Sequence, residues 1–270
     1  MKTFKILFVT LLLLCSSLGV KAQCTFRNTA FNPGEFLTYN LYYNWKFVWV
    51  KAGSASMYVV KSNYRGTPAY RCSLTTRGNH RVDDFFVLRD TLLCYSSLQM
   101  APLYFRKGAR EGSRYYVDEV FYSYPNGRQH IRQHKLTPQH RNEWKQRTLN
   151  DCVYDMLNIF LRARSFEPLN WKKGHVVSFP IADGDNIDPA QLRFTGKTTI
   201  KGDNGVKYRC LRLSYYERED GKWRHIVDFF ISDDQNHVPI RLDMFLKFGS
   251  AKAFLVGMKG IRNPMTSIVR

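Results

Sequence analysis

The feature that most constrains this chain is a period-two alternation of aromatic or aliphatic residues with polar residues, repeated along most of its length. The first such segment, from Glu35 to Val50, reads EFLTYNLYYNWKFVWV, and similar segments follow as far as residue 259. Side chains along a strand point alternately to the two faces of its sheet, so the pattern predicts strands with one buried face. Turn signals such as Asn126-Gly127 separate the segments, because these residues tolerate positive φ. We therefore expect a mainly β, antiparallel protein.

The predicted strands fall into two groups with a helix between them. They cover residues 35–50, 54–61, 70–75, 85–96, 103–107, 114–124 and 129–135, and then 175–182, 191–201, 206–217, 223–232, 237–248 and 252–259. In the intervening segment, apolar residues recur at helical spacing at Val153, Met156, Leu157, Phe160 and Leu161. Asn150 or Asp151 can cap this helix, and Pro168 follows it. We expect one main α-helix over about residues 150–164.

The two groups of strands also share short sequences in the same order. Tyr70-Arg71-Cys72 is matched by Tyr208-Arg209-Cys210, and Asp84-Phe85-Phe86-Val87 by Asp228-Phe229-Phe230-Ile231. One interpretation is chance similarity between aromatic strands. The other is that two related β-lobes, residues 31–147 and 174–260, form one antiparallel curved sheet or barrel-like assembly. Either way, residues 23–270 are predicted to be a single β-rich domain.

Residues 1–22 have the pattern of a signal peptide. Lys2 and Lys5 precede an apolar run from Ile6 to Leu14, and the segment ends in the small residue Ala22. We expect an exported bacterial protein, located in the periplasm, whose mature chain begins at Gln23. Nothing after this segment approaches the roughly 20 continuous apolar residues of a membrane helix, so no transmembrane segment is expected.

The chain is strongly basic, with 41 Lys plus Arg against 22 Asp plus Glu, a net charge of +19. Removal of the signal peptide takes away three lysines and no acid, which leaves +16. Part of the excess lies in a stretch with many aromatic residues, at Arg106, Lys107, Arg110, Arg114, Arg128, Arg132 and Lys135. We regard these seven residues as the candidate binding site for an anionic partner. In an exported protein that partner is an anionic glycan, a lipid or an envelope protein rather than nucleic acid. A solvated strand face is the alternative.

No motif points to a metal, a cofactor or catalysis. The mature chain has five cysteines, Cys24, Cys72, Cys94, Cys152 and Cys210, in no metal-ligand spacing. Their odd number leaves at least one unpaired within the chain, and the disulfide pairing stays open. We interpret His130, His134 and His140 as surface residues, and the segment Asp183 to Asp188 as a turn rather than a calcium loop. Buried free thiols are the expected state of Cys72 and Cys210.

Signatures of nucleophilic hydrolases, zinc proteases and nucleotide-binding loops are missing. A pair of carboxylates, such as Glu35 with Asp151 or Asp228, would allow glycoside hydrolysis if folding brought the two together. A non-enzymatic protein is therefore favoured, and no catalytic residue is assigned.

Several motifs in order resemble a bacterial exported family, the domain of unknown function 3108. They are Asn32-Pro33-Gly34-Glu35-Phe36-Leu37-Thr38-Tyr39, Gly53-Ser54-Ala55, Asp151-x-x-Tyr154-Asp155-x-Leu157, Lys207-x-x-Cys210-x-Arg212-Leu213 and Phe230-Ile231-Ser232-Asp233-Asp234-x-x-His237-Val238-Pro239-Ile240. The resemblance spans about residues 31–258. It implies an envelope protein with a mostly antiparallel β fold, and it carries no established catalytic set.

Structural roles account for the motif residues Gly34, Glu35, Tyr39, Gly53, Asp151, Cys210, Asp234 and Pro239. The two glycines suit turns or bulges, Glu35 suits an ion pair with an arginine of one lobe, Asp151 suits the helix cap, and Pro239 suits the start of an edge strand.

The sequence thus favours a non-enzymatic periplasmic binding or envelope-maintenance protein for a lipid, glycan or protein partner. Two alternatives stay open: a hydrolase of envelope polysaccharide that uses a carboxylate pair, and a structural or assembly partner. The oligomeric state is not determined by the sequence.

Overall fold

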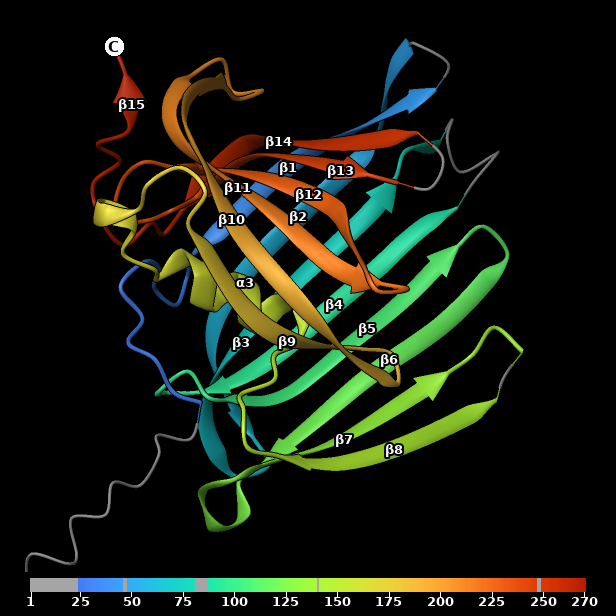
Figure 1. Ribbon diagram of the computed structural model, residues 1–270. Helices are drawn as coiled ribbons and strands as arrows, with labels where there is room; N and C mark the ends of the chain where they lie inside the picture. Colours follow the sequence, from blue (N-terminus) through green and yellow to red (C-terminus); the bar gives the residue numbers. More distant parts are fainter. Residues whose placement is uncertain (1–23, 46–47, 81–86, 140, 247–248) are drawn as a thin grey trace, which may run out of the picture.

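The computed structural model describes residues 24–45, 48–80, 87–139, 141–246 and 249–270. They form one strongly curved antiparallel sheet with a single α-helix inside the curve (Figure 1). The strands are β1 (Phe36–Trp45), β2 (Val48–Tyr64), β3 (Thr67–Gly78), β4 (Leu88–Ser97), β5 (Pro102–Glu111), β6 (Arg114–Ser123), β7 (Gln129–Leu136), β8 (Asn142–Leu149), β9 (Val176–Asp183), β10 (Asn186–Lys201), β11 (Lys207–Glu219), β12 (Lys222–Ser232), β13 (Pro239–Phe245), β14 (Ser250–Lys259) and β15 (Ile268–Val269). The helix is α3 (Met156–Arg164).

The sheet is a meander in two halves. Its strand order is β8-β7-β6-β5-β4-β3-β2-β1-β14-β13-β12-β11-β10-β9, with β15 added beside β11. Strands β1 and β14 pair from Phe36 with Lys259 to Asn44 with Ser250, and this ladder joins the halves. The path ends at β8 and β9, which do not pair with each other, so the sheet is not closed by a ladder. The predicted curved antiparallel sheet with one helix is confirmed.

The helix begins later than the sequence pattern indicates. Asp155 is its N-cap and accepts hydrogen bonds from the backbone amides of Leu157 (3.1 Å) and Asn158 (2.9 Å). The predicted cap Asp151 is wrong, because the chain from Asp151 to Tyr154 is not helical. Tyr154 instead makes a parallel bridge with Ile181 of β9. Met156, Leu157, Phe160 and Leu161 lie in the helix, as the pattern indicates, and only Val153 of that pattern belongs to the extended segment.

Three further features differ from the sequence predictions. The segment from Glu35 to Val50 contributes to two strands, β1 and the beginning of β2, which pair with each other. Strand β8 was not predicted, because seven of its eight residues are polar or charged or carry an exposed ring, and the pattern of a buried face is missing. Strand β13 lies between β12 and β14 and is not an edge. Pro239 is tolerated as its first residue, where a missing amide removes little from the ladder.

The two copies of the Tyr-Arg-Cys sequence lie on β3 and β11 and use opposite faces. Cys72 shares its face with Leu74 and Thr76, which line the interior of the curve, whereas Cys210 alternates with the interior residues Leu211 and Leu213. A shift of one residue along a strand exchanges its faces. The sequence similarity therefore does not extend to the side chains that line the interior. The matched segment at residues 84–86 lies outside the described residues.

Candidate ligand-binding cavity

A cavity of about 480 Å³ lies between the two halves of the sheet, beside α3. Residues of β1 to β3 and of β9 to β14 line it: Tyr39, Leu41, Ala55, Met57, Leu74, Phe179, Ile181, Leu192, Leu213, Val227, Phe229, Ile231, Leu242, Met244 and Ala253. The helix adds one face, at Met156, Leu157, Ile159, Phe160 and Ala163. Small-molecule sites in proteins commonly have about 300–1,000 Å³ and a mainly apolar lining. The size and lining of this cavity fit that class of site.

The cavity follows directly from the alternation in the strands. On β1, Leu37, Tyr39 and Leu41 face inward, and on β11, Leu211, Leu213 and Tyr215 do the same. These interior positions bury large side chains at the end of the curve that α3 fills. Small residues occupy inward positions beside them, because Ala55 on β2 pairs with Tyr39 and Ala253 on β14 pairs with Leu41. The missing side-chain volume leaves the cavity open there.

One end of the cavity is polar. Thr76, Lys107 and Glu217 are part of its lining, and Asp90 lies directly across from Thr76 in the β3–β4 ladder. Thr76 Oγ1 and Asp90 Oδ1 are both buried. Burial raises the pKa of Asp90 to about 6 and also raises the pKa of Glu217. This end can therefore contact a polar group, while the remaining wall contacts apolar atoms.

The turn between β9 and β10 bridges the open side of the sheet. The Gln133 side-chain amide on β7 donates to the backbone oxygens of Gly184 (2.9 Å) and Asn186 (2.8 Å). The Asp185 carboxylate pairs with Lys135 (3.3 Å) and Lys145 (2.5 Å). The segment is a turn, as expected, and these contacts hold it against β7 and β8. Side-chain contacts thus cover the gap that the strands leave.

At the other end of the cavity, Glu35 and Arg164 form a buried ion pair. The guanidinium donates to both carboxylate oxygens, at 2.5 and 2.9 Å, and both side chains are almost completely buried. Arg164 also donates to the backbone oxygen of Asn236 (3.0 Å). The predicted ion pair of Glu35 is confirmed, but its partner belongs to the helix rather than to a lobe of the sheet.

Other family-motif residues surround this pair. The Tyr39 hydroxyl donates to the backbone oxygen of Pro239 at 3.1 Å. Asp234 accepts from the Ser232 hydroxyl (2.9 Å) and from the amide of Asn236 (3.0 Å), which shapes the turn before β13. Motifs that are far apart in the sequence therefore meet at one place, where they join β1, α3 and the turn before β13.

Steric constraints explain why glycine occupies the two motif positions, Gly34 and Gly53. Gly34 has φ +96°, in the region that favours glycine. At Gly53, an added Cβ would lie 2.1 Å from the backbone oxygen of Arg77, so only glycine allows β2 to approach β3 at the irregularity in the β1–β2 register. The predicted turn and bulge positions are confirmed.

His237 gives this end of the molecule a pH response. Its ring Nδ1 donates to the backbone oxygen of Arg164 (2.5 Å), and burial lowers its pKa. Below about pH 6.5 the unfolded chain binds a proton here that the native state does not, so this residue lowers stability as pH falls. The His237→Asn variant, whose new side chain tolerates the φ of +43° at this position, should lose this contribution.

The measurement is urea unfolding at pH 7.5, 6.5 and 5.5. We expect the difference in unfolding free energy between the native protein and the variant to change by up to about 1 kcal/mol per pH unit below pH 6.5. The comparison isolates His237, because Asp155, whose pKa burial raises to about 6, titrates with the opposite sign in both proteins. Parallel pH curves for the two proteins would contradict the assignment.

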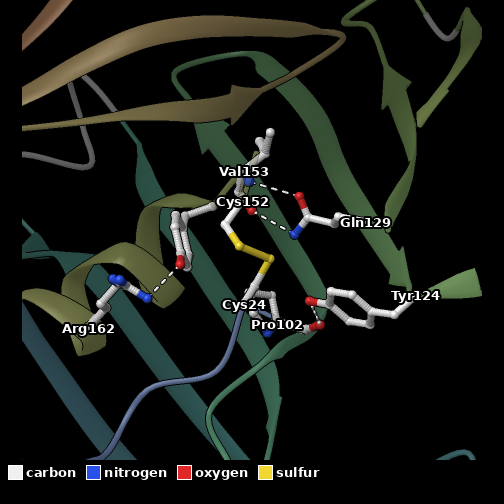
Figure 2. Close-up of a disulfide and its surroundings, with 8 residues drawn as sticks. Cys24, Pro102, Tyr124, Gln129, Cys152, Val153 and Arg162 are labelled. Atoms are coloured by element: carbon white, nitrogen blue, oxygen red, sulfur yellow. Dashed lines mark hydrogen bonds between the residues drawn. A yellow bond between two sulfur atoms is a disulfide. The ribbon is translucent and has the colours of Figure 1, made fainter. Parts of the chain in front are cut away.

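A disulfide joins Cys24 to Cys152, just ahead of α3 (Figure 2). Beside it, the Gln129 side chain pairs with the backbone of Val153, donating to its oxygen (3.0 Å) and accepting from its amide (2.8 Å). Tyr124 donates to the backbone oxygen of Pro102 (2.9 Å). The segment before the helix is thereby attached to the N-terminal segment and to β7.

In the part of the chain that the structure describes, the other three cysteines, Cys72, Cys94 and Cys210, are buried free thiols, as predicted for Cys72 and Cys210. Cys72 and Cys94 are direct partners in the β3–β4 ladder. Burial raises the pKa of Cys94 well above its ordinary value and that of Cys210 to about 12. Because the thiolate is the reactive form, these thiols are unreactive in the native state.

The predicted basic stretch is divided between the two faces of the sheet. Lys107 lines the cavity and Lys135 binds the β9–β10 turn, so both are interior residues. Arg106 and Arg132 alternate with them and point to the outer face. Arg110, Arg114 and Arg128 are exposed near strand ends. The seven residues therefore do not form one binding site.

The structure does not bring together the carboxylates proposed for hydrolysis. Glu35 is paired with Arg164, Asp151 is exposed ahead of α3, and Asp228 on β12 binds Arg212 (2.5 Å) and His225 (2.8 Å). His130 and His134 are on β7, and His140 lies outside the described residues. In the described part of the chain, no three His, Cys, Asp or Glu side chains are placed to hold a metal ion, and no helix is long and apolar enough to cross a membrane.

The fold and the cavity define a class of protein: an open, barrel-like antiparallel sheet that encloses an apolar site. The chain belongs to the family described as protein of unknown function (DUF3108), whose model matches residues 38–256. The resemblance seen in the sequence motifs is confirmed. No curated protein matches the chain.

One solved structure shows the same type of fold. A β-barrel-like protein of the domain of unknown function DUF1849 from Brucella abortus has a TM-score of 0.57 at 11% identity, covering 87% of this chain and 100% of that one. A putative exported protein with a YmcC-like fold from Bacteroides fragilis has a TM-score of 0.35 at 10% identity, with the same coverage.

Proposed function

We propose that this protein is an exported, periplasmic binding protein that holds the hydrocarbon part of a lipid in the cavity between the halves of its sheet. The observation that carries the proposal is the apolar lining of the 480 Å³ cavity, to which strands of both halves and α3 contribute. Each methylene moved from water into such a site contributes about 0.8 kcal/mol. A bound acyl chain therefore has a strong driving force and needs no polar motif.

The polar end supports an amphipathic ligand. Thr76, Lys107 and Glu217 offer a hydroxyl, an ammonium and a carboxylate beside an otherwise apolar wall. A lipid has this same division into an apolar chain and a polar head. The Cys24–Cys152 disulfide supports the export part of the proposal, since disulfides persist in oxidising compartments. The charge of the chain supports an encounter with anionic envelope surfaces.

The test is binding of a fluorescent fatty acid, with palmitate as competitor, to the mature protein and two variants. Ala253→Phe places a ring in the cavity, whereas Val256→Phe adds the same ring at an exposed position on the same strand. We expect Ala253→Phe to weaken binding by tenfold or more and Val256→Phe to leave it unchanged. Native mass spectrometry of protein purified from its own periplasm should also show a lipid adduct.

Thermal unfolding of both variants is the control for folding, because a misfolded protein would also lose binding. Ala253→Phe fills existing space and should keep a native melting temperature within a few degrees. Equal affinity of the native protein and Ala253→Phe for the fatty acid, with both folded, would refute binding in the cavity.

A further inference from the structure

A continuous band of aromatic rings and arginines crosses the outer face of the sheet, on the side opposite the cavity. We define the arginine–aromatic band by the following residues: Tyr64, Arg65, Tyr95, Tyr104, Phe121, Arg132, His134 and Trp144. They come from β2, β4, β5, β6, β7 and β8 and from the turn after β2. Apart from Tyr64 and Arg65, no two residues of the band are adjacent in the sequence.

Neighbouring rings in the band are in contact. The centroids of Tyr64 and Tyr104 are 5.6 Å apart, those of Tyr104 and Phe121 are 5.0 Å apart, and those of Phe121 and Trp144 are 6.0 Å apart. His134 stacks on Trp144 at 4.3 Å. The Tyr104–Phe121 and His134–Trp144 contacts join adjacent strands, whereas the Tyr64–Tyr104 and Phe121–Trp144 contacts reach over the strands between them. The side chains therefore form one row. Trp144 is 51% exposed.

The strand alternation places the band on the outside. Lys107 lines the cavity, so its neighbours Arg106 and Gly108 and the next residue of that face, Tyr104, point outward. Phe121 is the direct partner of Tyr104, and His134 of Trp144, in the adjoining ladders. The band is therefore separated from the lipid cavity by the thickness of the sheet, and the two sites are independent.

Two guanidinium groups lie on the rings. The Arg65 guanidinium carbon is 5.4 Å from the centroid of Tyr64 and 5.7 Å from that of Phe121. The Arg132 guanidinium carbon is 5.1 Å from Phe121 and 4.9 Å from Trp144. Because both contact Phe121, they are at most 5.7 plus 5.1, or 10.8 Å, apart. Ring contacts of this type hold a guanidinium in place while its N–H groups stay available.

The charge of the band favours an anion. Both arginines are exposed, and within the described residues neither has a carboxylate at ion-pair distance. The acid that lies in the band, Glu119, accepts hydrogen bonds from the Tyr104 hydroxyl and from His134 (2.7 Å). The negative charge of Glu119 therefore already has hydrogen-bond donors within the band. Arginines bind carboxylate, sulfate and phosphate groups through paired N–H donors.

We propose that the arginine–aromatic band binds an anionic polysaccharide. Its elongated shape across six strands fits a linear chain, its two arginines match successive acidic groups, and its rings offer flat amphipathic surfaces to sugar rings. A flat membrane is a poorer match, because the apolar rings lie against one another in the row instead of projecting separately from the surface. This site goes beyond lipid binding and does not depend on it.

The experiment measures binding of alginate oligosaccharides, a polyuronate, to the mature protein at 0.15 M salt by calorimetry. Neutral dextran, vesicles containing anionic phospholipid, and single-stranded DNA are the comparison probes. We expect binding to alginate and none to dextran. The double variant Arg65→Gln/Arg132→Gln should weaken alginate binding by tenfold or more, and Trp144→Ala should weaken it severalfold.

Arg218→Gln combined with Lys222→Gln is the control, because it removes the same charge from exposed positions in the other half of the sheet. It should change alginate affinity less than threefold. Equal losses in the band variant and the control would mean that only net charge attracts the polymer and would overturn the proposal. Tighter binding of the vesicles or the DNA than of alginate would overturn the assignment of the ligand. Fatty-acid binding should be unchanged in the band variants, which separates this test from that of the cavity.

Discussion

The Glu35→Gln variant is expected to be less stable than the native protein by about 3–5 kcal/mol in unfolding free energy. The side chain of Arg164 is only 1% exposed, and glutamine in place of Glu35 leaves its charge buried without a counter-ion. Typical domains unfold with about 5–15 kcal/mol, so the loss is a large part of the total. Urea unfolding followed by circular dichroism measures it directly.

A double variant separates the effect of an unpaired buried charge from the effect of altered side-chain packing. In Glu35→Leu/Arg164→Met no buried charge remains, and we expect it to be more stable than Glu35→Gln. Lys197→Met, which breaks an exposed ion pair with Asp233, should cost less than about 1 kcal/mol. If Glu35→Gln cost no more than Lys197→Met, the buried pair would not have the role described here.

Replacement of both disulfide cysteines, Cys24→Ser/Cys152→Ser, is the second large effect. The bridge spans 128 residues, for which chain entropy alone implies roughly 5 kcal/mol, and measured losses are usually about 2–5 kcal/mol. We expect a correspondingly lower midpoint in urea. The loss should affect α3 in particular, because the bridge holds the segment immediately before it.

Cys210→Ala provides the comparison for the disulfide variant. It removes a buried thiol that forms no bridge and should cost less than about 2 kcal/mol. Addition of a thiol reductant should lower the stability of the native protein toward that of the double variant and leave the double variant unchanged. Identical unfolding curves for the native and doubly substituted proteins would contradict this role.

Both predictions concern residues that sequence reasoning found in part. Glu35 was recognised from a motif and was expected to pair with an arginine, but Arg164 was not identified. The reason is physical: Arg164 is the last residue of α3 and reaches Glu35 only because the helix lies inside the curve of the sheet. No local pattern distinguishes such a buried arginine from the many exposed ones in this basic chain.

The candidate sites, too, are only partly predictable from the sequence. The basic stretch around residues 106–135 is detectable by composition, but its residues do not form one surface because adjacent residues on a strand face opposite ways. Arg106 and Lys107 are neighbours in the sequence, but one is outside and the other lines the cavity. The Arg65 guanidinium and Tyr64 belong to the arginine–aromatic band although they lie far from that stretch in the chain.

By itself, the sequence determined the family, the β class, most strand positions and the existence of one helix, because alternation and turn residues act over a few positions. Only the tertiary structure decided which face of each strand lines the cavity, where α3 begins, and which rings and arginines meet outside. Those outcomes depend on strand order and register, which join residues such as Tyr64 and Phe121 through contacts that no local stretch of sequence contains.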